Sequence, residues 1–293
     1  MDMLLPADLR SRLKRLALVT RHAAGHRGVG WHRSTSRGAG LEFAQYRSYE
    51  PGDDLRQIDW KLYGRSDKFF VRESERESPV AVWVLIDASG SMRQADRARP
   101  DLTRLDAARL LTLCIAELAI QQGDRFGFAT LGGAAPVVLA AGTGARQRDA
   151  LRLALQAVTA EGGPPEPQAL APLWNRIRAR DLVIVLSDFF DEGTAALAER
   201  LAAAGRETLA IRLLTVEERD FPFTDGHRFR DPETGAELLG DGRALRDAYL
   251  ARFTEAEAAL RARFEAAGIR HAVLTLDHPI DTPLRELFAR GAA

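Results

Sequence analysis

Three oxygen-bearing side chains stand at alternate positions near the middle of the first half of the chain. Asp87, Ser89 and Ser91 directly follow a nearly continuous apolar run over residues 80–86. Residues two apart in an extended turn point the same way, so a carboxylate and two hydroxyls can converge on one point, and Gly90 permits the tight path between the serines. Hard oxygen ligands suit Mg²⁺, Mn²⁺ or Ca²⁺ and do not suit zinc or copper. The spacing predicts a divalent-cation site.

A second acid, Asp188, stands with Ser187 directly after another continuous apolar run, residues 182–186. In an open α/β sheet, ligands gather outside the carboxyl ends of the strands, so we expect Asp188 to reach the same ion directly or through water. So few charged ligands would leave the ion with open positions for a carboxylate from outside. The alternative is purely structural, with Asp87 capping the turn that follows it, because Asp and Ser are common turn residues.

The chain after Pro79 alternates predicted strands and helices, which indicates an α/β protein with an open, Rossmann-like doubly wound, mostly parallel sheet. Thr103 is expected to open one helix, with Asp106 as its capping partner and Gly123 as its end. The predicted buried strands are 80–86, 182–187, 209–216 and 272–276, and a hairpin at 125–140 supplies an antiparallel edge. Further helices are predicted at 146–158, 168–179, 195–204, 245–264 and 283–290. Residues 221–242 are predicted to be an inserted loop or hairpin.

The part before Pro79 has a different pattern. Leu5, Leu9, Leu13 and Leu16 share one face of a short predicted helix, and a Gly/His/Ser/Arg-rich loop follows at about 23–40. Strand-like segments at 41–49 and 68–73 flank a turn-rich stretch, which predicts a small β-rich unit. We therefore expect two domains, 1–78 with the helix, basic loop and β-rich unit, and 79–293 with the α/β fold.

The charge balance argues against a general nucleic-acid or membrane binder. The chain has 41 basic and 41 acidic residues, so no global field attracts anionic partners. A basic arm from Arg10 to Arg37 contains no acid and offers a contact for an acidic partner, a nucleic acid or anionic lipid, although a solvated helix face and polar loop is the plainer interpretation.

Cysteine usage and hydropathy predict a cytoplasmic protein. The single cysteine, Cys114, excludes an internal disulfide and lies in an apolar run, which favours an inert buried thiol in a reducing compartment. No apolar run approaches the ~20 residues that span a bilayer, and the start of the chain does not have the pattern of a signal peptide.

Two segments carry a resemblance to known families. Trp83 to Met92 resembles the metal-ion-dependent adhesion site of von Willebrand factor A domains, and Arg47 to Trp60 resembles the signature of the bacterial domain-of-unknown-function family 58. The resemblance runs from about Gly40 to at least Asp191. It implies a Rossmann-like A domain, whose cation binds a partner's acidic residue, and frequent genomic pairing with MoxR-type AAA+ ATPases. It implies no known reaction.

The sequence departs from the adhesion-site pattern at one ligand. A-domain sites usually take a third hydroxyl from a Thr in a Gly-Gly-Thr loop, and the equivalent loop here is expected at residues 161–166, with Pro164 in place of Thr. Proline offers no side-chain ligand. Either Glu161 or Glu166 compensates, or the site is weak or vacant.

The signature block, residues 47–60, has two possible roles. Arg56 and Asp59 are expected to pair with each other or with Arg47, in a hydrogen-bonded turn that joins the β-rich unit to the A domain. The alternative is a surface that recognises a partner, with Tyr49 and Trp60 among its apolar residues.

These observations favour a non-enzymatic protein-interaction module that presents Mg²⁺, Mn²⁺ or Ca²⁺, held by Asp87, Ser89, Ser91 and Asp188, to an acidic residue of a protein partner. By resemblance, the partner is expected to be a MoxR-type AAA+ ATPase, with this chain as its adaptor. One alternative is a metal-dependent hydrolase that uses the same carboxylates, although no second metal cluster or placed base is evident. Another is nucleic-acid or lipid binding through the basic arm.

Overall fold

A computed structural model describes residues 5–14, 16–18, 43–49, 58–74, 81–133, 136–163 and 171–288. The chain divides into two compact units, with residues 27–79 in the smaller and the flanking segments 1–26 and 80–293 in the larger. Each unit is held together by its own internal contacts.

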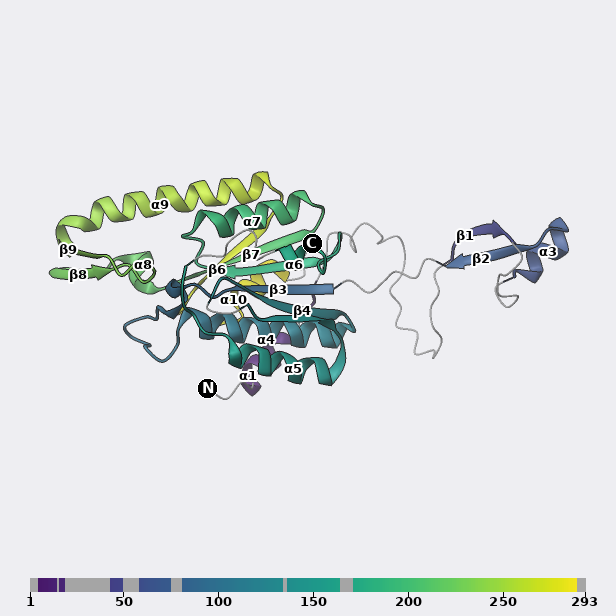
Figure 1. The fold of residues 1–293 in the computed structure, drawn as a ribbon, viewed down its shortest axis with the longest axis horizontal. Helices are drawn as coiled ribbons and strands as arrows, with labels where there is room; N and C mark the ends of the chain where they lie inside the picture. The colour runs from purple at the N-terminus through teal and green to yellow at the C-terminus, as the bar shows by residue number, and fades with distance from the viewer. Residues whose placement is uncertain are drawn as a thin grey trace. The chain divides into compact units, whose positions relative to one another are not determined.

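The larger unit is built on a six-stranded sheet with the order β10-β7-β6-β3-β4-β5 (Figure 1). Every neighbouring pair is parallel except β4 and β5, so β5 is an antiparallel edge. The first strand of this sheet in sequence, β3, lies in the middle. The chain then adds β4 and β5 on one side of β3 and β6, β7 and β10 on the other side. The strands are β3 Ala81–Asp87, β4 Arg125–Leu131, β5 Val138–Gly142, β6 Leu182–Ser187, β7 Glu207–Leu214 and β10 Arg270–Thr275.

Both faces of the sheet are covered, which explains the uninterrupted apolar runs. Every residue of β3 and of β6 is buried. Along β3, Val82, Val84 and Ile86 belong to one hydrophobic cluster, while Trp83 and Leu85 belong to another, because successive side chains of a strand point to opposite faces.

Helices cover both sides of this sheet (Figure 1). The first cluster takes its helical residues from α1, α4, α5 and α10, and the second takes most of them from α7 and α9. The bounds are α1 Ala7–Leu13, α4 Arg104–Gln122, α5 Gly144–Ala157, α6 Ala171–Trp174, α7 Glu192–Ala203, α8 Val216–Asp220, α9 Gly242–Ala266 and α10 Thr282–Phe288. Of the predicted helices, 168–179 is observed only as the short α6 within the described residues.

The helix α4 has the ends that the sequence predicts. The Thr103 hydroxyl accepts from the Asp106 backbone N–H at 3.1 Å, and the Asp106 carboxylate accepts from the Thr103 backbone N–H at 3.3 Å. Gly123 ends the helix with φ of 77°, a left-handed conformation that glycine adopts without steric cost.

The inserted segment is a hairpin, β8 Gly226–Arg230 paired with β9 Glu237–Asp241, and it leads directly into α9. Phe221 stacks between Phe229 of β8 and Tyr249 of α9, with ring centroids 5.7 and 4.4 Å apart. This aromatic stack fixes β8 of the hairpin against α9.

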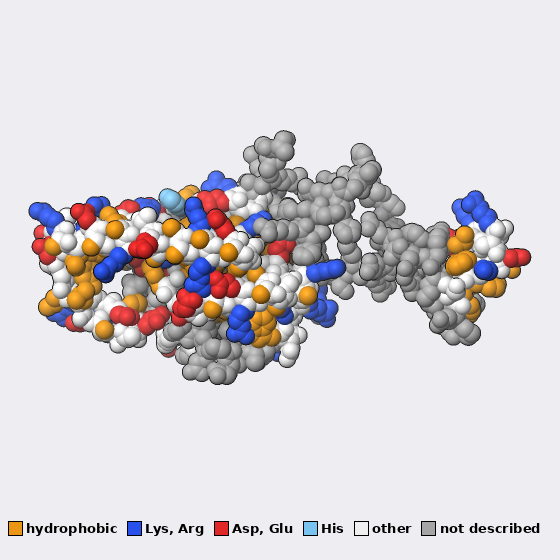
Figure 2. Space-filling model, turned by 90° about the horizontal axis from the view of Figure 1, so that it is seen from above, with side chains coloured by type: hydrophobic (Ala, Val, Ile, Leu, Met, Phe, Trp, Pro, Cys, Tyr) orange, Lys and Arg blue, Asp and Glu red, His pale blue; other side chains and the backbone are white. Residues whose placement is uncertain are grey.

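The face of the larger unit that carries α9 has interspersed charge. Figure 2 shows basic and acidic side chains alternating over this face, without a continuous basic patch. Arg263 of α9 pairs with Glu192 and Glu199 of α7, at 2.7 and 2.9 Å. This face therefore carries charges of both signs.

The N-terminal helix packs with the larger unit, unlike the expected division at 78/79 that grouped it with the β-rich segment. Leu9 and Leu13 of α1 are buried in the same hydrophobic cluster as α4. The side chain of Gln122 holds the segment after α1, since its Oε1 accepts from Leu18 N at 2.7 Å and its Nε2 donates to Leu18 O at 3.0 Å. The apolar face of α1 is therefore buried against the larger unit, next to α4.

The smaller unit contains a helix that the sequence analysis did not predict. Strands β1 Phe43–Ser48 and β2 Phe70–Ser74 fall in the two segments predicted as strands and pair antiparallel, but the helix α3 Trp60–Ser66 lies between them in the chain. Asp59 caps α3 by accepting from the backbone N–H groups of Lys61 and Leu62 at 2.9 and 3.0 Å. The expected partner Arg56 and the turn at 50–54 lie outside the described residues.

Candidate cation site at the carboxyl edge of the sheet

The carboxyl ends of β3 and β6 lie side by side, and each delivers one of the predicted acids. The two strands are parallel neighbours, with Ile86 opposite Leu186. Asp87 is the last residue of β3, and Asp188 follows the last residue of β6. The strand-end placement that the sequence predicts therefore brings both acids to one edge of the sheet, at the point where the strand order reverses.

Asp87 is a buried carboxylate held by neutral donors. Its side chain is 2% exposed, its Oδ1 accepts from Ser89 N at 2.9 Å, and its Oδ2 accepts from Ser187 Oγ at 2.6 Å. Burial raises the pKa of the Asp87 carboxyl, and the hydrogen bonds from Ser187 and Ser89 oppose that rise. Among the described residues, no basic side chain forms an ion pair with Asp87.

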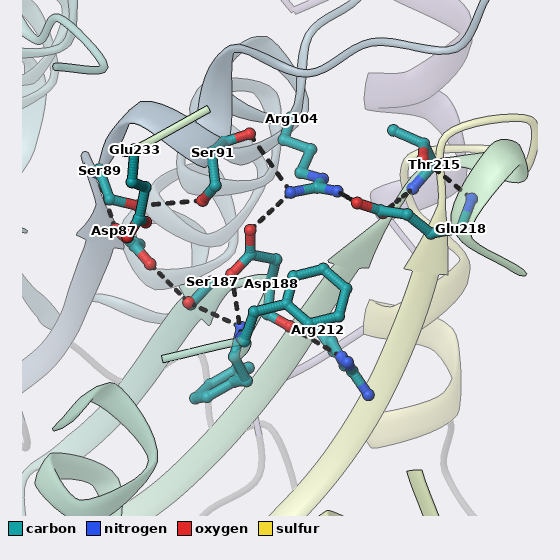
Figure 3. Close-up of polar contacts among 12 residues, drawn as sticks. Asp87, Ser89, Ser91, Arg104, Ser187, Asp188, Arg212, Thr215, Glu218 and Glu233 are labelled. Carbon is teal, nitrogen blue, oxygen red and sulfur yellow. Dashed lines mark hydrogen bonds and ion pairs between the residues drawn. The ribbon is translucent and has the colours of Figure 1, made fainter. Parts of the chain in front are cut away.

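The two serines stand beside this carboxylate (Figure 3). Their hydroxyl oxygens lie 3.1 Å apart, and Ser89 and Ser91 are 2% and 7% exposed. Ser91 belongs to the short 3₁₀ turn η2, Gly90–Arg93, which follows β3. The structure thus gathers Asp87 and both hydroxyls in the way that their alternate spacing predicts.

Asp188 faces a different partner. Its Oδ2 accepts from Arg104 Nη1 at 2.5 Å and its Oδ1 accepts from Phe190 N at 3.1 Å. Arg104, in the first turn of α4, is 1% exposed and also donates to Ser91 O at 3.3 Å. A guanidinium therefore already neutralises Asp188, and the direct or water-mediated contact of Asp188 with an ion stays a prediction.

The same guanidinium connects the site to α8. Arg104 Nη2 forms an ion pair with Glu218, and Glu218 caps α8 together with Thr215. Arg212 of β7 donates through Nε to Asp188 O at 2.8 Å and pairs with Glu257 of α9. We did not single out Arg104 from the sequence, because one arginine at a helix start is usually a solvated charge.

The loop expected to hold the third ligand lies next to the Asp87 loop. Glu161 N donates to Ala88 O at 3.0 Å, and Gly90 N donates to Gly162 O at 2.9 Å. Pro164 and Glu166 lie outside the described residues. The backbone contacts support the sequence alignment of this loop and leave the identity of a third ligand as a prediction.

A further acid, Glu233, comes from the turn of the β8–β9 hairpin. Figure 3 places it beside Asp87 and Ser89. Much of the side chain is exposed, yet partial burial and then the negative charges of Asp188 and Asp87 raise the pKa of the Glu233 carboxyl. Because Glu233 belongs to an irregular insertion, nothing in the sequence predicted that it would lie at the carboxyl edge of the sheet.

The chemistry of this set fits a hard divalent cation. It comprises a buried carboxylate without a basic partner, two adjacent hydroxyls and a nearby second carboxylate, and all of these donors are oxygen. No three carboxylate, imidazole or thiol groups in the described part of the chain form a ready-made metal cluster. An ion here would therefore depend on hydroxyls and water as well as on carboxylates.

The family follows from the sequence itself. Residues 45–272 match the family model described as "Protein of unknown function DUF58". The chain belongs to this family. The match spans the signature block, the Asp87 loop, the Arg104 helix and the hairpin turn with Glu233, so the DUF58 assignment covers the whole candidate site.

The curated relatives are uncharacterized proteins from Mycobacterium bovis and Mycobacterium tuberculosis, each 29% identical over 209 residues. The match covers 70% of this DUF58 chain and 65% of each relative, so the chain spans about two thirds of their length.

Similar solved structures include BatB from Bacteroides thetaiotaomicron, at 15% identity and a TM-score of 0.38 over 64% of this chain and 98% of that one. The SpRpn10 VWA domain is 17% identical, with a TM-score of 0.40 over 71% of this chain and 93% of that domain. At these scores the likenesses say nothing about function.

The predicted fold class is confirmed. The DUF58 chain has a Rossmann-like, mostly parallel α/β sheet, with β3 in the middle and the Asp87 loop at its carboxyl end. Among the described residues, none of the helices has the length and apolar character needed to cross a membrane.

Proposed function

We propose that this DUF58 chain is a non-enzymatic binding module that presents a divalent cation, Mg²⁺ or Mn²⁺ or Ca²⁺, to an acidic residue of a protein partner. One observation carries the proposal. Asp87 is buried without a basic partner among the described residues, beside the hydroxyls of Ser89 and Ser91. Burying a carboxylate is unfavourable unless its charge is compensated, and a cation bound by these oxygens supplies that compensation.

The cation would supply electrophilic attraction for an incoming carboxylate, and the chain's own groups would hold and orient it. Asp87 contributes charge, Ser89 and Ser91 contribute neutral oxygens, and Ser187 orients Asp87 by donating to Oδ2. With few protein charges on the ion, positions stay open for other oxygen ligands. A single such contact is weak against water, so it acts as a switch on a wider interface.

The hydrolase alternative is less well supported. General-base catalysis needs a group free to accept a proton from water. Of the two carboxylates that the sequence predicts for this role, Asp188 is held by Arg104, and Asp87 already accepts from Ser187 and Ser89. Turnover of a generic phosphoester by the purified chain, lost in an Asp87 variant, would favour the hydrolase instead.

By family resemblance we propose a MoxR-type AAA+ ATPase as the partner, in the cytoplasm predicted from the sequence. Capture of that ATPase by the purified chain should weaken with chelator and with Asp87→Asn, while Asp149→Asn, an exposed substitution on α5, should leave capture unchanged. Capture that is unaffected by both chelator and Asp87→Asn would overturn the cation-dependent mechanism.

Cation binding is tested separately from partner binding. Magnesium at ten times its dissociation constant should stabilise the fold by about 1.4 kcal/mol through mass action. In thermal unfolding, magnesium should raise the melting temperature of the wild type and of Asp149→Asn. It should not raise the melting temperature of Asp87→Asn. An equal rise in Asp87→Asn would place the ion elsewhere.

A further inference from the structure

The turn of the β8–β9 hairpin lies directly against the loop that follows β3. A side chain at Gly90 would place its Cβ 2.8 Å from Pro232 O, a separation that real Cβ atoms essentially never show. Gly90 therefore permits the hairpin backbone to approach the Asp87 loop closely. The residue after Pro232 is Glu233, so this contact places an acid at the candidate site.

The hairpin turn holds Glu233 in a defined position. Asp231 Oδ1 accepts from the backbone N–H groups of Glu233 and Thr234 at 2.8 and 3.1 Å. Asp231 N donates to Ala236 O at 2.8 Å, and Gly235 N donates to Asp231 O at 2.9 Å. These bonds tie the turn to itself, and the stack of Phe221, Phe229 and Tyr249 ties β8 to α9.

Charge at this edge of the sheet is unbalanced. Glu233 lies beside Asp87 and Ser89 (Figure 3). Arg104 compensates Asp188, but in the described part of the chain neither Asp87 nor Glu233 has a basic partner. Two carboxylates without a counterion, one fully buried and the other beside it, are the arrangement that a bound cation stabilises.

We infer that Glu233 is the acidic ligand that this chain supplies to its own cation, so that the hairpin turn closes the site from within. The inference rests on the proposed cation site and deepens it. Glu233 takes one of the coordination positions that the few ligands of the Asp87 loop leave open. A carboxylate from a partner would then have to displace Glu233, which makes the hairpin turn a competitor of the partner.

Terbium luminescence in the 293-residue chain tests this inference, because Tb³⁺ is a hard cation and its luminescence lifetimes in H₂O and D₂O report the number of coordinated waters. Glu233→Gln should gain about one or two coordinated waters and bind Tb³⁺ about tenfold more weakly, since a charged ligand is lost. The matched control is Glu237→Gln, the same substitution on the same hairpin, where the acid pairs with Arg228 at 3.4 Å. That control should match the wild type.

The water count separates direct coordination from a distant effect of charge. If Glu233→Gln bound Tb³⁺ more weakly but gained no coordinated water, Glu233 would act only through its long-range charge, and the inference would be overturned. Unchanged Tb³⁺ affinity in Glu233→Gln would overturn it as well.

Asp87→Asn separates the two proposals. Loss of Tb³⁺ binding in Asp87→Asn, together with an unchanged water count in Glu233→Gln, would leave the cation site standing and remove only the role of Glu233. Both the proposed cation site and the role of Glu233 would be overturned if Asp87→Asn bound Tb³⁺ as tightly as the wild type does, or if the wild type did not bind Tb³⁺.

Discussion

Arg104 Nη1 lies 2.5 Å from Asp188 Oδ2, and both side chains are almost completely buried. The pair joins the start of α4 to the end of β6, across the edge of the sheet that carries the candidate site. Because Arg104 also pairs with Glu218, it links this edge to α8. Its removal would leave Asp188 as a buried carboxylate without its counterion.

The first prediction concerns this ion pair. Arg104→Ala is expected to lower the free energy of unfolding by about 3–5 kcal/mol, the usual cost of removing one partner from a buried pair. Urea unfolding measures the change. The exposed Arg93→Ala is the control and should stay within about 0.5 kcal/mol of wild type. The double variant Arg104→Met/Asp188→Asn should recover part of the loss. A cost below about 1 kcal/mol for Arg104→Ala would mean that Asp188 is solvated.

The second prediction concerns Ser187, which orients Asp87. Ser187→Ala removes the hydroxyl that donates to Asp87 Oδ2 at 2.6 Å and accepts from Phe189 N at 2.9 Å. We expect a loss of about 1–3 kcal/mol in unfolding free energy, because two buried groups lose a partner. Ser187→Thr keeps the hydroxyl and should retain more stability than Ser187→Ala in the same urea titration. Equal losses in the two variants would show that packing, not the hydroxyl, matters there.

The third prediction tests the contact between the hairpin and the Asp87 loop. Gly90→Ala places a methyl group against Pro232 O and should push the turn away, whereas Gly226→Ala on the same hairpin meets nothing within 4 Å. Hydrogen exchange should therefore quicken at the backbone amides of residues 231 and 233–236 in Gly90→Ala and stay unchanged in Gly226→Ala. Unchanged exchange in Gly90→Ala would mean that the loops shift together without separating.

The fourth prediction concerns the missing hydroxyl ligand. If Pro164 stands where A-domain sites have threonine, Pro164→Thr should tighten cation binding, with no change in far-ultraviolet circular dichroism. Isothermal titration with Mn²⁺ measures the affinity. Unchanged affinity would mean either that a nearby acid already fills the position or that the sequence alignment of the loop is wrong.

Some of the structure was readable from local sequence signals. The apolar runs before Asp87 and Asp188 predicted two buried parallel strands, because strands covered on both faces admit few polar residues. Thr103 and Asp106 predicted the start of α4, since capping partners stand three residues apart. The convergence of Asp87, Ser89 and Ser91 was likewise local, because it depends on alternate positions in one loop.

The identity of the groups around that loop was decided by tertiary structure. Arg104 and Asp188 lie 84 positions apart in sequence, and the hairpin that carries Glu233 lies further along the chain still. A lone arginine or an acid in an insertion looks like an ordinary surface charge in sequence. Only the packing of α4 and the hairpin against the sheet edge determines which charges are buried, which are neutralised, and which are left without a counterion. The sequence determined the loop, and the long-range packing determined its electrostatic surroundings.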